Sequence, residues 1–434
     1  MAGQNILKKL TNALHGSTPP KWAPLDNAAK IFPPTAHGAD TGVFRMSCEL
    51  NEKVNPELLQ KGLDDALKQF QHMRMVMRHG LFWYYLEQTS LKPVVVPEHA
   101  APCSQLYVDS KSLLFEVSYW RNKINLEVFH VLTDGNGAFS FFRAILTRYL
   151  ALCHPQAEIE DAPKASVFER REDSFQRYYQ KHRVYNPVAG GTAYHLKGQK
   201  RHEGGLSFIE GVAQVRQALD AAHRYNTTLT VYLTAALFEA IHKQMYLSDM
   251  HKPVVLTVPV NLRSFFPSET ARNFFGVIRV KYNFKEQSSA FEDIIADTAR
   301  QFRENLTPER LEDRINQMSA LEHHPFIRIV PLVIKDPIMR FAGYLSDRAQ
   351  TATISNVGRF ELPEKILSYV RGLGIFMSTY AIQICAGTCA GKIHFGISSA
   401  FADPIIQRGF FSRLVSDGVD IEIRSNEHHR EETK

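Results

Sequence analysis

One histidine, followed at a fixed spacing by an aspartate and a glycine, is the strongest candidate for chemistry in this chain. Three residues separate His130 from Asp134, and Gly135 comes next. The alternation of apolar and polar residues over 124–130 predicts a β-strand with His130 at the end of its apolar face. Apolar residues spaced three and four apart from Phe139 onward predict a helix after the turn. A histidine held between a strand and a helix is suited to act as a general base.

The same residues also have a purely structural explanation. Asp-Gly-Asn-Gly over 134–137 is a common turn sequence, and a single histidine at a strand end is usually structural or exposed. The stretch by itself therefore favours neither explanation decisively.

Length and composition indicate a two-domain enzyme. The chain has 434 residues, more than one hydrophobic core usually contains. Its 44% hydrophobic and 22% charged residues are ordinary for a soluble globular protein. The net charge of +6 is small and its basic residues are scattered, which argues against nucleic acid and remains compatible with an anionic small molecule.

Cysteine usage and hydropathy predict a cytoplasmic protein without a metal. No Cys-x-x-Cys pair or disulfide framework is present, and His323-His324 lacks metal-ligand spacing. No apolar run is long enough to span a bilayer, and 1–21 makes a poor signal peptide. The cysteines number five: Cys48, Cys103, Cys153, Cys385 and Cys389.

Composition along the chain predicts two structured parts joined by a polar crossover. The first part contains a strand, a helix, further strands including 79–86, and then the strand, turn and helix around His130. The crossover is expected to be partly helical around 168–182. The predicted boundaries are 1–21 for an irregular N-terminal segment, 22–154 for the first part, 155–204 for the linker, 205–424 for the second part and 425–434 for a charged tail.

The second part is predicted to mix strands and helices. Helices are expected over 212–225 and 231–245, the second capped near Thr228. The segment after residue 306 contains several prolines and is expected to be mixed in structure. Residues 351–358 are expected to form a short strand that ends in a turn at Ser355 and Asn356.

Taken together, the motifs resemble the CoA-dependent acyltransferase superfamily. His130-x-x-x-Asp134-Gly135 is similar to the signature shared by chloramphenicol acetyltransferase, peptide-synthetase condensation domains, plant BAHD acyltransferases, wax-ester synthases and alcohol acetyltransferases. The companion sequences Pro-Val-Asn-Leu-Arg at 259–263, Asn-Phe-Phe-Gly at 273–276 and Ser-Asn-Val-Gly at 355–358 follow in the expected order. The resemblance runs from about residue 22 to about residue 424 and is closest to bacterial alcohol acetyltransferases.

One departure from the pattern concerns the residue before the histidine. Condensation domains and wax-ester synthases usually carry two adjacent histidines, whereas Phe129 occupies the first position here. The departure weakens these two assignments and leaves His130 in place.

The resemblance implies an α/β protein built as two α+β two-layer sandwiches. These two chloramphenicol acetyltransferase-like halves would form a cleft with a through-tunnel. Because paired halves complete the site within one chain, a monomer is expected.

The resemblance also implies roles for the motif residues. His130 would act as general base without a covalent acyl-enzyme. Asp134 would support the site through an ion pair with Arg263, although Arg74 or Arg78 could replace that arginine. Gly135 would serve backbone geometry, with its N–H facing the oxyanion, or would be a plain turn glycine.

Five further residues are candidates for substrate binding. Asn273, Phe275 and Gly276 are expected to shape the cleft. Ser355 and Asn356 would bond the acceptor or the tetrahedral oxygen, or would only terminate a strand.

The predicted function is transfer of a short, acetyl-like acyl group from acyl-CoA to an alcohol or an amine. Acyl-CoA is a co-substrate, and no permanently bound cofactor or metal is expected. The alternatives are a long-chain wax-ester or diacylglycerol-type transferase, a condensation-like protein that uses a carrier-protein thioester, and a non-catalytic binding module.

Overall fold

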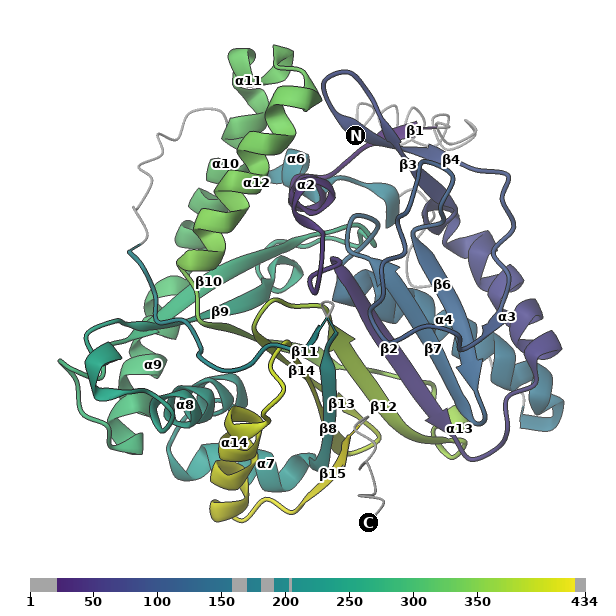
Figure 1. Ribbon diagram of the computed structural model, residues 1–434. Coiled ribbons are helices and arrows are strands. Elements are labelled where there is room, and N and C mark those ends of the chain that lie inside the picture. Colours follow the sequence, from purple (N-terminus) through teal and green to yellow (C-terminus); the bar gives the residue numbers. More distant parts are fainter. Residues whose placement is uncertain (1–21, 158–169, 181–190, 203–204, 426–434) are drawn as a thin grey trace, which may run out of the picture.

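Three β-sheets with helices packed on them make up the protein. The computed structural model describes residues 22–157, 170–180, 191–202 and 205–425 (Figure 1). The sheets have three, five and seven strands. Within these residues, no helix combines the length and the hydropathy needed to cross a bilayer.

The five-stranded sheet has the order β12-β2-β7-β6-β5 and carries the first half of the chain. Helices α3 (Pro56–Gln69) and α4 (Gly135–Cys153) pack against each other over it. The side chain of Asn55 caps α3 by accepting from the N–H groups of Glu57 and Leu58, and Pro56 fills its first position. The strands are β2 (Val43–Leu50), β5 (Val96–Pro97), β6 (Phe115–Trp120), β7 (Lys123–Phe129) and β12 (Val370–Met377).

A small sheet lies beside it, with the order β1-β4-β3. Its strands are β1 (Trp22–Pro24), β3 (Met75–His79) and β4 (Tyr84–Gln88). The single strand predicted over 79–86 is wrong, because the chain turns at Gly80, whose N–H donates to Trp83 O at 3.1 Å. The short elements here are η1 (Ala28–Ile31), α2 (Phe32–Thr35) and η2 (Gln71–Met73).

The seven-stranded sheet has the order β10-β9-β11-β13-β14-β8-β15. Helices α7 (Val215–Arg224), α8 (Leu229–His242), α9 (Phe291–Asn305) and α14 (Ile405–Ser416) lie together against it (Figure 1). The strands are β8 (Ser207–Gln214), β9 (Val254–Asn261), β10 (Phe275–Tyr282), β11 (Ala352–Arg359), β13 (Ile382–Cys389), β14 (Lys392–Ser399) and β15 (Ile421–Ser425).

Two predictions for the second half are corrected by the structure. The helix expected from residue 212 begins at Val215, because β8 continues to Gln214. The proline-containing segment is helical: α10 (Pro308–His323), α11 (Pro325–Ile329) and α12 (Leu332–Arg348). Its prolines 308 and 325 stand at the first position of a helix, where a missing N–H costs nothing.

The two larger sheets are joined by β12. This strand follows residue 205 in the chain and yet pairs antiparallel with β2 in the first sheet. It also packs on β13 and β14, where a Cβ atom at Gly396 would overlap the Ile375 carbonyl. Residues 205–424 therefore contribute to both sheets. The remaining short elements are η3 (Pro155–Ala157), α6 (Ser174–Tyr178), η5 (Leu247–Asp249), η6 (Leu262–Ser264) and α13 (Glu364–Leu367).

Candidate active site

The motif occupies the turn between β7 and α4. His130 directly follows the strand, and its N–H donates to Gly42 O at 2.9 Å. Asp134 is the N-cap of α4, where its Oδ1 accepts from Gly137 N at 3.0 Å. The carboxylate therefore ends the turn and starts the helix.

The other oxygen of Asp134 binds the second half of the chain. Its Oδ2 lies 2.7 Å from Nη1 of Arg263 and accepts from Phe274 N at 2.8 Å. Both side chains are buried, with 6% and 9% exposed. Arg263 also donates to the carbonyl oxygens of Thr270 and Arg272.

The two alternative arginines bond elsewhere. Arg74 donates to Thr89 O at 3.4 Å. Arg78 forms an ion pair with Glu87 at 2.7 Å on the small sheet. Arg263 is thus the arginine that pairs with Asp134.

The His130 ring is surrounded by aromatic rings. Phe32 of α2 stacks on it with the centroids 4.6 Å apart and an angle of 11°. Phe44 of β2 lies 5.1 Å away at a steep angle, and Phe275 of β10 lies 5.2 Å away. The imidazole, itself partly exposed, is therefore held between both halves of the chain.

Asn273 fixes which nitrogen of His130 carries the proton. Its Oδ1 lies 3.0 Å from His130 Nδ1, while its Nδ2 donates to His130 O at 3.0 Å and to Asp26 Oδ2 at 3.2 Å. A carbonyl and a carboxylate only accept, so the amide nitrogen must face them and Oδ1 must face the ring. Nδ1 therefore donates, and the neutral ring carries its free lone pair on Nε2.

Burial shifts the pKa values of both ends of this chain of hydrogen bonds. Desolvation lowers the pKa of His130 below its ordinary value, and Asp134 and the bond to Asn273 partly oppose the change. Burial raises the pKa of Asp26 to about 6, although Arg272 lies 3.6 Å away and opposes the rise. His130 is thus held neutral, and therefore basic, at neutral pH.

The close approach between the two halves lies at Gly137 rather than at Gly135. A Cβ atom at Gly135 would make an ordinary contact, 3.4 Å from Val357 Cγ1. A Cβ atom at Gly137 would overlap the Thr133 hydroxyl and the Ala271 carbonyl. The notebook of sequence patterns alone assigns the backbone role to Gly135, because any turn glycine has that freedom.

The remaining predicted binding residues lie around this centre. Gly276 follows Phe275 in β10 and pairs with Val260 of β9. Ser355 and Asn356 lie within β11, not in a turn after it, and Asn356 Nδ2 donates to Thr230 Oγ1 at 2.9 Å. The contact of Val357 with Gly135 brings this strand beside the motif.

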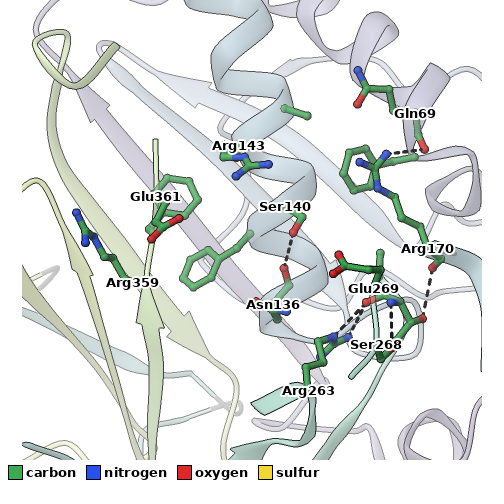
Figure 2. A pocket seen from close by; sticks show the side chains of 16 residues that line it. Gln69, Asn136, Ser140, Arg143, Arg170, Arg263, Ser268, Glu269, Arg359 and Glu361 are labelled. Carbon is green, nitrogen blue, oxygen red and sulfur yellow. Dashed lines mark hydrogen bonds between the residues drawn. The ribbon is translucent and has the colours of Figure 1, made fainter. Parts of the chain in front are cut away.

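A cavity of about 340 Å³ opens beside the first turns of α4. Figure 2 shows Asn136, Ser140 and Arg143 along the helix, with Arg359 on the opposite wall. Arg263 also contributes to the lining, whereas His130 does not. The cavity arginines were not predicted, because they lie far apart in the sequence.

Within the described residues, no group of three or more His, Cys, Asp or Glu side chains could hold a metal ion. All five cysteines are free. The chemistry available at this centre is therefore proton transfer by an imidazole beside a carbonyl-binding turn.

We predict that Asp134→Ala lowers the free energy of unfolding by about 3–5 kcal/mol, because the variant leaves the Arg263 charge buried without its partner. Urea unfolding followed by circular dichroism measures the change. Asp173→Ala is the matched control: this aspartate caps α6 through two backbone N–H groups, so its loss should cost only about 1 kcal/mol. Equal losses in the two variants would contradict the role of the ion pair.

A second matched pair tests the close approach of the two halves. We expect Gly137→Ala to lower stability by about 1–3 kcal/mol through overpacking, while Gly135→Ala changes it little. Thermal melting of both variants measures the difference. A larger loss in Gly135→Ala would show that the tight contact is misassigned.

The comparisons with known proteins agree with this site. Residues 189–380 match the family model described as alcohol acetyltransferase. No curated protein matches the chain in sequence.

Several solved structures share the fold at low sequence identity. F. graminearum TRI101, solved with coenzyme A and T-2 mycotoxin, has a TM-score of 0.62 and 11% identity, covering 92% of this chain and 99% of its own. Polyketide synthase associated protein 5 from Mycobacterium tuberculosis has a TM-score of 0.59 and 12% identity, covering 91% and 97%. The starter condensation domain of rhizomide synthetase, solved with C8-CoA, has a TM-score of 0.60 and 12% identity, covering 93% and 98%.

The predicted fold class is confirmed, since mixed α/β sheets with helices are shared with these acetyltransferases and condensation domains. The family match and the acetyltransferase neighbours indicate the reaction class. The chain is an O-acyltransferase with the chloramphenicol acetyltransferase-like fold, and its residues 189–380 resemble alcohol acetyltransferases.

Proposed function

We propose that the protein transfers a short acyl group from acyl-CoA to the hydroxyl or amino group of a small acceptor, with His130 as the general base. The observation that carries this proposal is the hydrogen bond from His130 Nδ1 to Asn273 Oδ1. It leaves Nε2 unprotonated, and Nε2 has no hydrogen-bond partner among the described residues.

The reaction needs one proton to move out and back. Nε2 takes the proton of the acceptor as its oxygen or nitrogen attacks the thioester carbonyl. The tetrahedral intermediate then collapses, the carbon–sulfur bond breaks, and the imidazolium returns the proton to the CoA thiolate. Because both substrates are held together, no covalent acyl-enzyme is required.

The other motif residues position this base and its substrates. Asp134 is engaged with Arg263 and with two backbone N–H groups, so it supports the turn instead of exchanging protons. Gly135 begins α4, where a backbone N–H is available to an oxyanion. Phe275 and Gly276 would shape the cleft, and Ser355 and Asn356 would bond the acceptor.

The cavity beside α4 supports an anionic donor. Arg143, Arg170, Arg263 and Arg359 line it, against two acids, Glu269 and Glu361. Nε of Arg143 is buried without a hydrogen-bond partner among the described residues. Phosphate groups such as those of CoA bind arginine well, because its planar donors match their oxygens.

The reaction class and the role of His130 can be tested together. We expect the parent to release thiol from acetyl-CoA when a panel of alcohols and amines is supplied. His130→Ala should reduce that rate roughly 100- to 10,000-fold and leave the circular dichroism spectrum unchanged.

The same assay separates the alternatives. Release with palmitoyl-CoA alone would favour a long-chain transferase. No release from any free thioester would favour a carrier-protein donor or a binding module. An unchanged rate in His130→Ala would overturn the assignment of the base.

The pH dependence gives a separate prediction. The base must be neutral, so activity is lost as the pH falls through the pKa of His130. Since burial lowers this pKa, the acid limb of kcat/KM should lie below pH 6.5, roughly the ordinary histidine value.

Asn273→Ala should move the limb to still lower pH, because the Asn273 bond raises the pKa of His130. It should also reduce kcat on the order of 10- to 100-fold by freeing the ring, with less effect on KM. A limb above pH 6.5 in the parent would contradict this account.

A further inference from the structure

Helices α11 and α12 present a row of large apolar side chains to solvent. Together these side chains form what we call the α11–α12 face: Phe326 and Ile329 on α11, and Val333, Ile334, Ile338, Phe341, Tyr344 and Leu345 on α12. Between 49% and 74% of each side chain is exposed. So many large apolar residues on two adjoining helices exceed the single scattered ones that are normal on a protein surface.

The face is not the side of α12 that packs on the protein. The buried residues of α12 are Leu332, Lys335 and Gly343. Leu332 N donates to Leu81 O at 2.9 Å, and Lys335 Nζ lies 3.4 Å from the Trp83 ring centre. Ile334, Ile338, Phe341 and Leu345 fall at helical spacings on the opposite stripe.

The apolar surface continues onto the neighbouring hairpin. Leu81 and Phe82, in the loop between β3 and β4, are 69% and 39% exposed. Both contact the start of α12 through backbone oxygens, which accept from Leu332 N and Lys335 Nζ. Figure 1 shows α10, α11 and α12 projecting at one corner of the molecule, with this hairpin beside them.

The exposed charges on the two helices favour a negatively charged partner. They are Arg328, Arg340 and Arg348, against the single acid Asp347. A helix with a wide apolar face and arginines at its margins is the pattern of elements that lie in a membrane interface. The apolar side chains enter the acyl region, while the guanidinium groups meet anionic headgroups.

We propose that the α11–α12 face binds the surface of a bilayer that contains anionic lipids. A convex apolar helix pair suits a deformable lipid surface better than a rigid protein groove. The charge balance selects anionic headgroups over zwitterionic ones. This binding does not depend on acyl transfer.

The location of the face gives the binding a consequence that does rest on the proposed function. Gly343 of α12 packs against Thr35 of α2, and Phe32 of the same short helix stacks on His130. One short helix therefore separates the membrane-facing helix from the imidazole. An apolar acceptor or acyl donor dissolved in the bilayer would reach the site without crossing water.

The test is flotation of the full chain with vesicles, without substrates. Two vesicle types are used: phosphatidylcholine alone, and phosphatidylcholine with phosphatidylglycerol. The parent should float with the anionic vesicles and bind less at high salt. The double variant Ile338→Asp, Phe341→Asp should lose about tenfold or more of this binding. Neither side chain contacts His130, so thiol release with a water-soluble acceptor should persist and report a folded enzyme.

Val415→Asp is the matched control. Val415 is 55% exposed on α14, against 60% for Ile338, and lies at the other end of the molecule (Figure 1). It should bind like the parent. A second variant, Arg328→Gln with Arg348→Gln, should remove the preference for anionic vesicles.

Four results would overturn the proposal. They are failure of the parent to float, equal binding by the Ile338→Asp, Phe341→Asp variant, loss of binding in Val415→Asp, and a dimer that the double variant dissolves. The last would identify the face as a contact between two copies, and sedimentation velocity detects it. Failure of acyl transfer would leave the vesicle result unaffected.

Discussion

The ion pair between Asp134 and Arg263 is the interaction on which the rest of the site depends. The two residues are 129 positions apart, and their buried contact joins the two halves of the chain. The same carboxylate caps α4 and accepts from Phe274 N. Because a buried charge without its partner is costly, the turn, the helix start and the second-half segment are held in one arrangement. An aspartate committed in this way has no lone pair to spare for the substrate.

The bond to Phe274 N also explains how the second half reaches the histidine. Side chains of an extended segment alternate in direction, so Asn273 and Phe275 point to one side and Phe274 to the other. Asn273 and Phe275 contact the His130 ring, while Phe274 packs against Phe175 of α6. Asp26, from the first strand's loop, then holds the Asn273 amide. The protonation of the base is therefore set by residues from three distant segments.

Some features were beyond prediction from local pattern for identifiable physical reasons. Prolines 308 and 325 were taken as signs of irregular structure, yet at the first position of a helix proline lacks only an N–H that would be unpaired. The strand predicted over 79–86 contains Gly80, which allows the tight turn instead. The pairing of β12 with β2 depends on contacts more than 300 residues apart, which no local periodicity encodes.

The sequence by itself determined the motif, the strand and helix that flank it, the candidate ion pair and the fold class, because these follow from residue spacing and local periodicity. Only the tertiary structure decided that Arg263 rather than Arg74 or Arg78 pairs with Asp134, that Asn273 and Asp26 orient the imidazole, and that Gly137 makes the close contact. It alone also revealed the exposed side of α12. The physical reason is the same in each case: burial and hydrogen bonding depend on which distant segments meet, and that is a property of the folded chain.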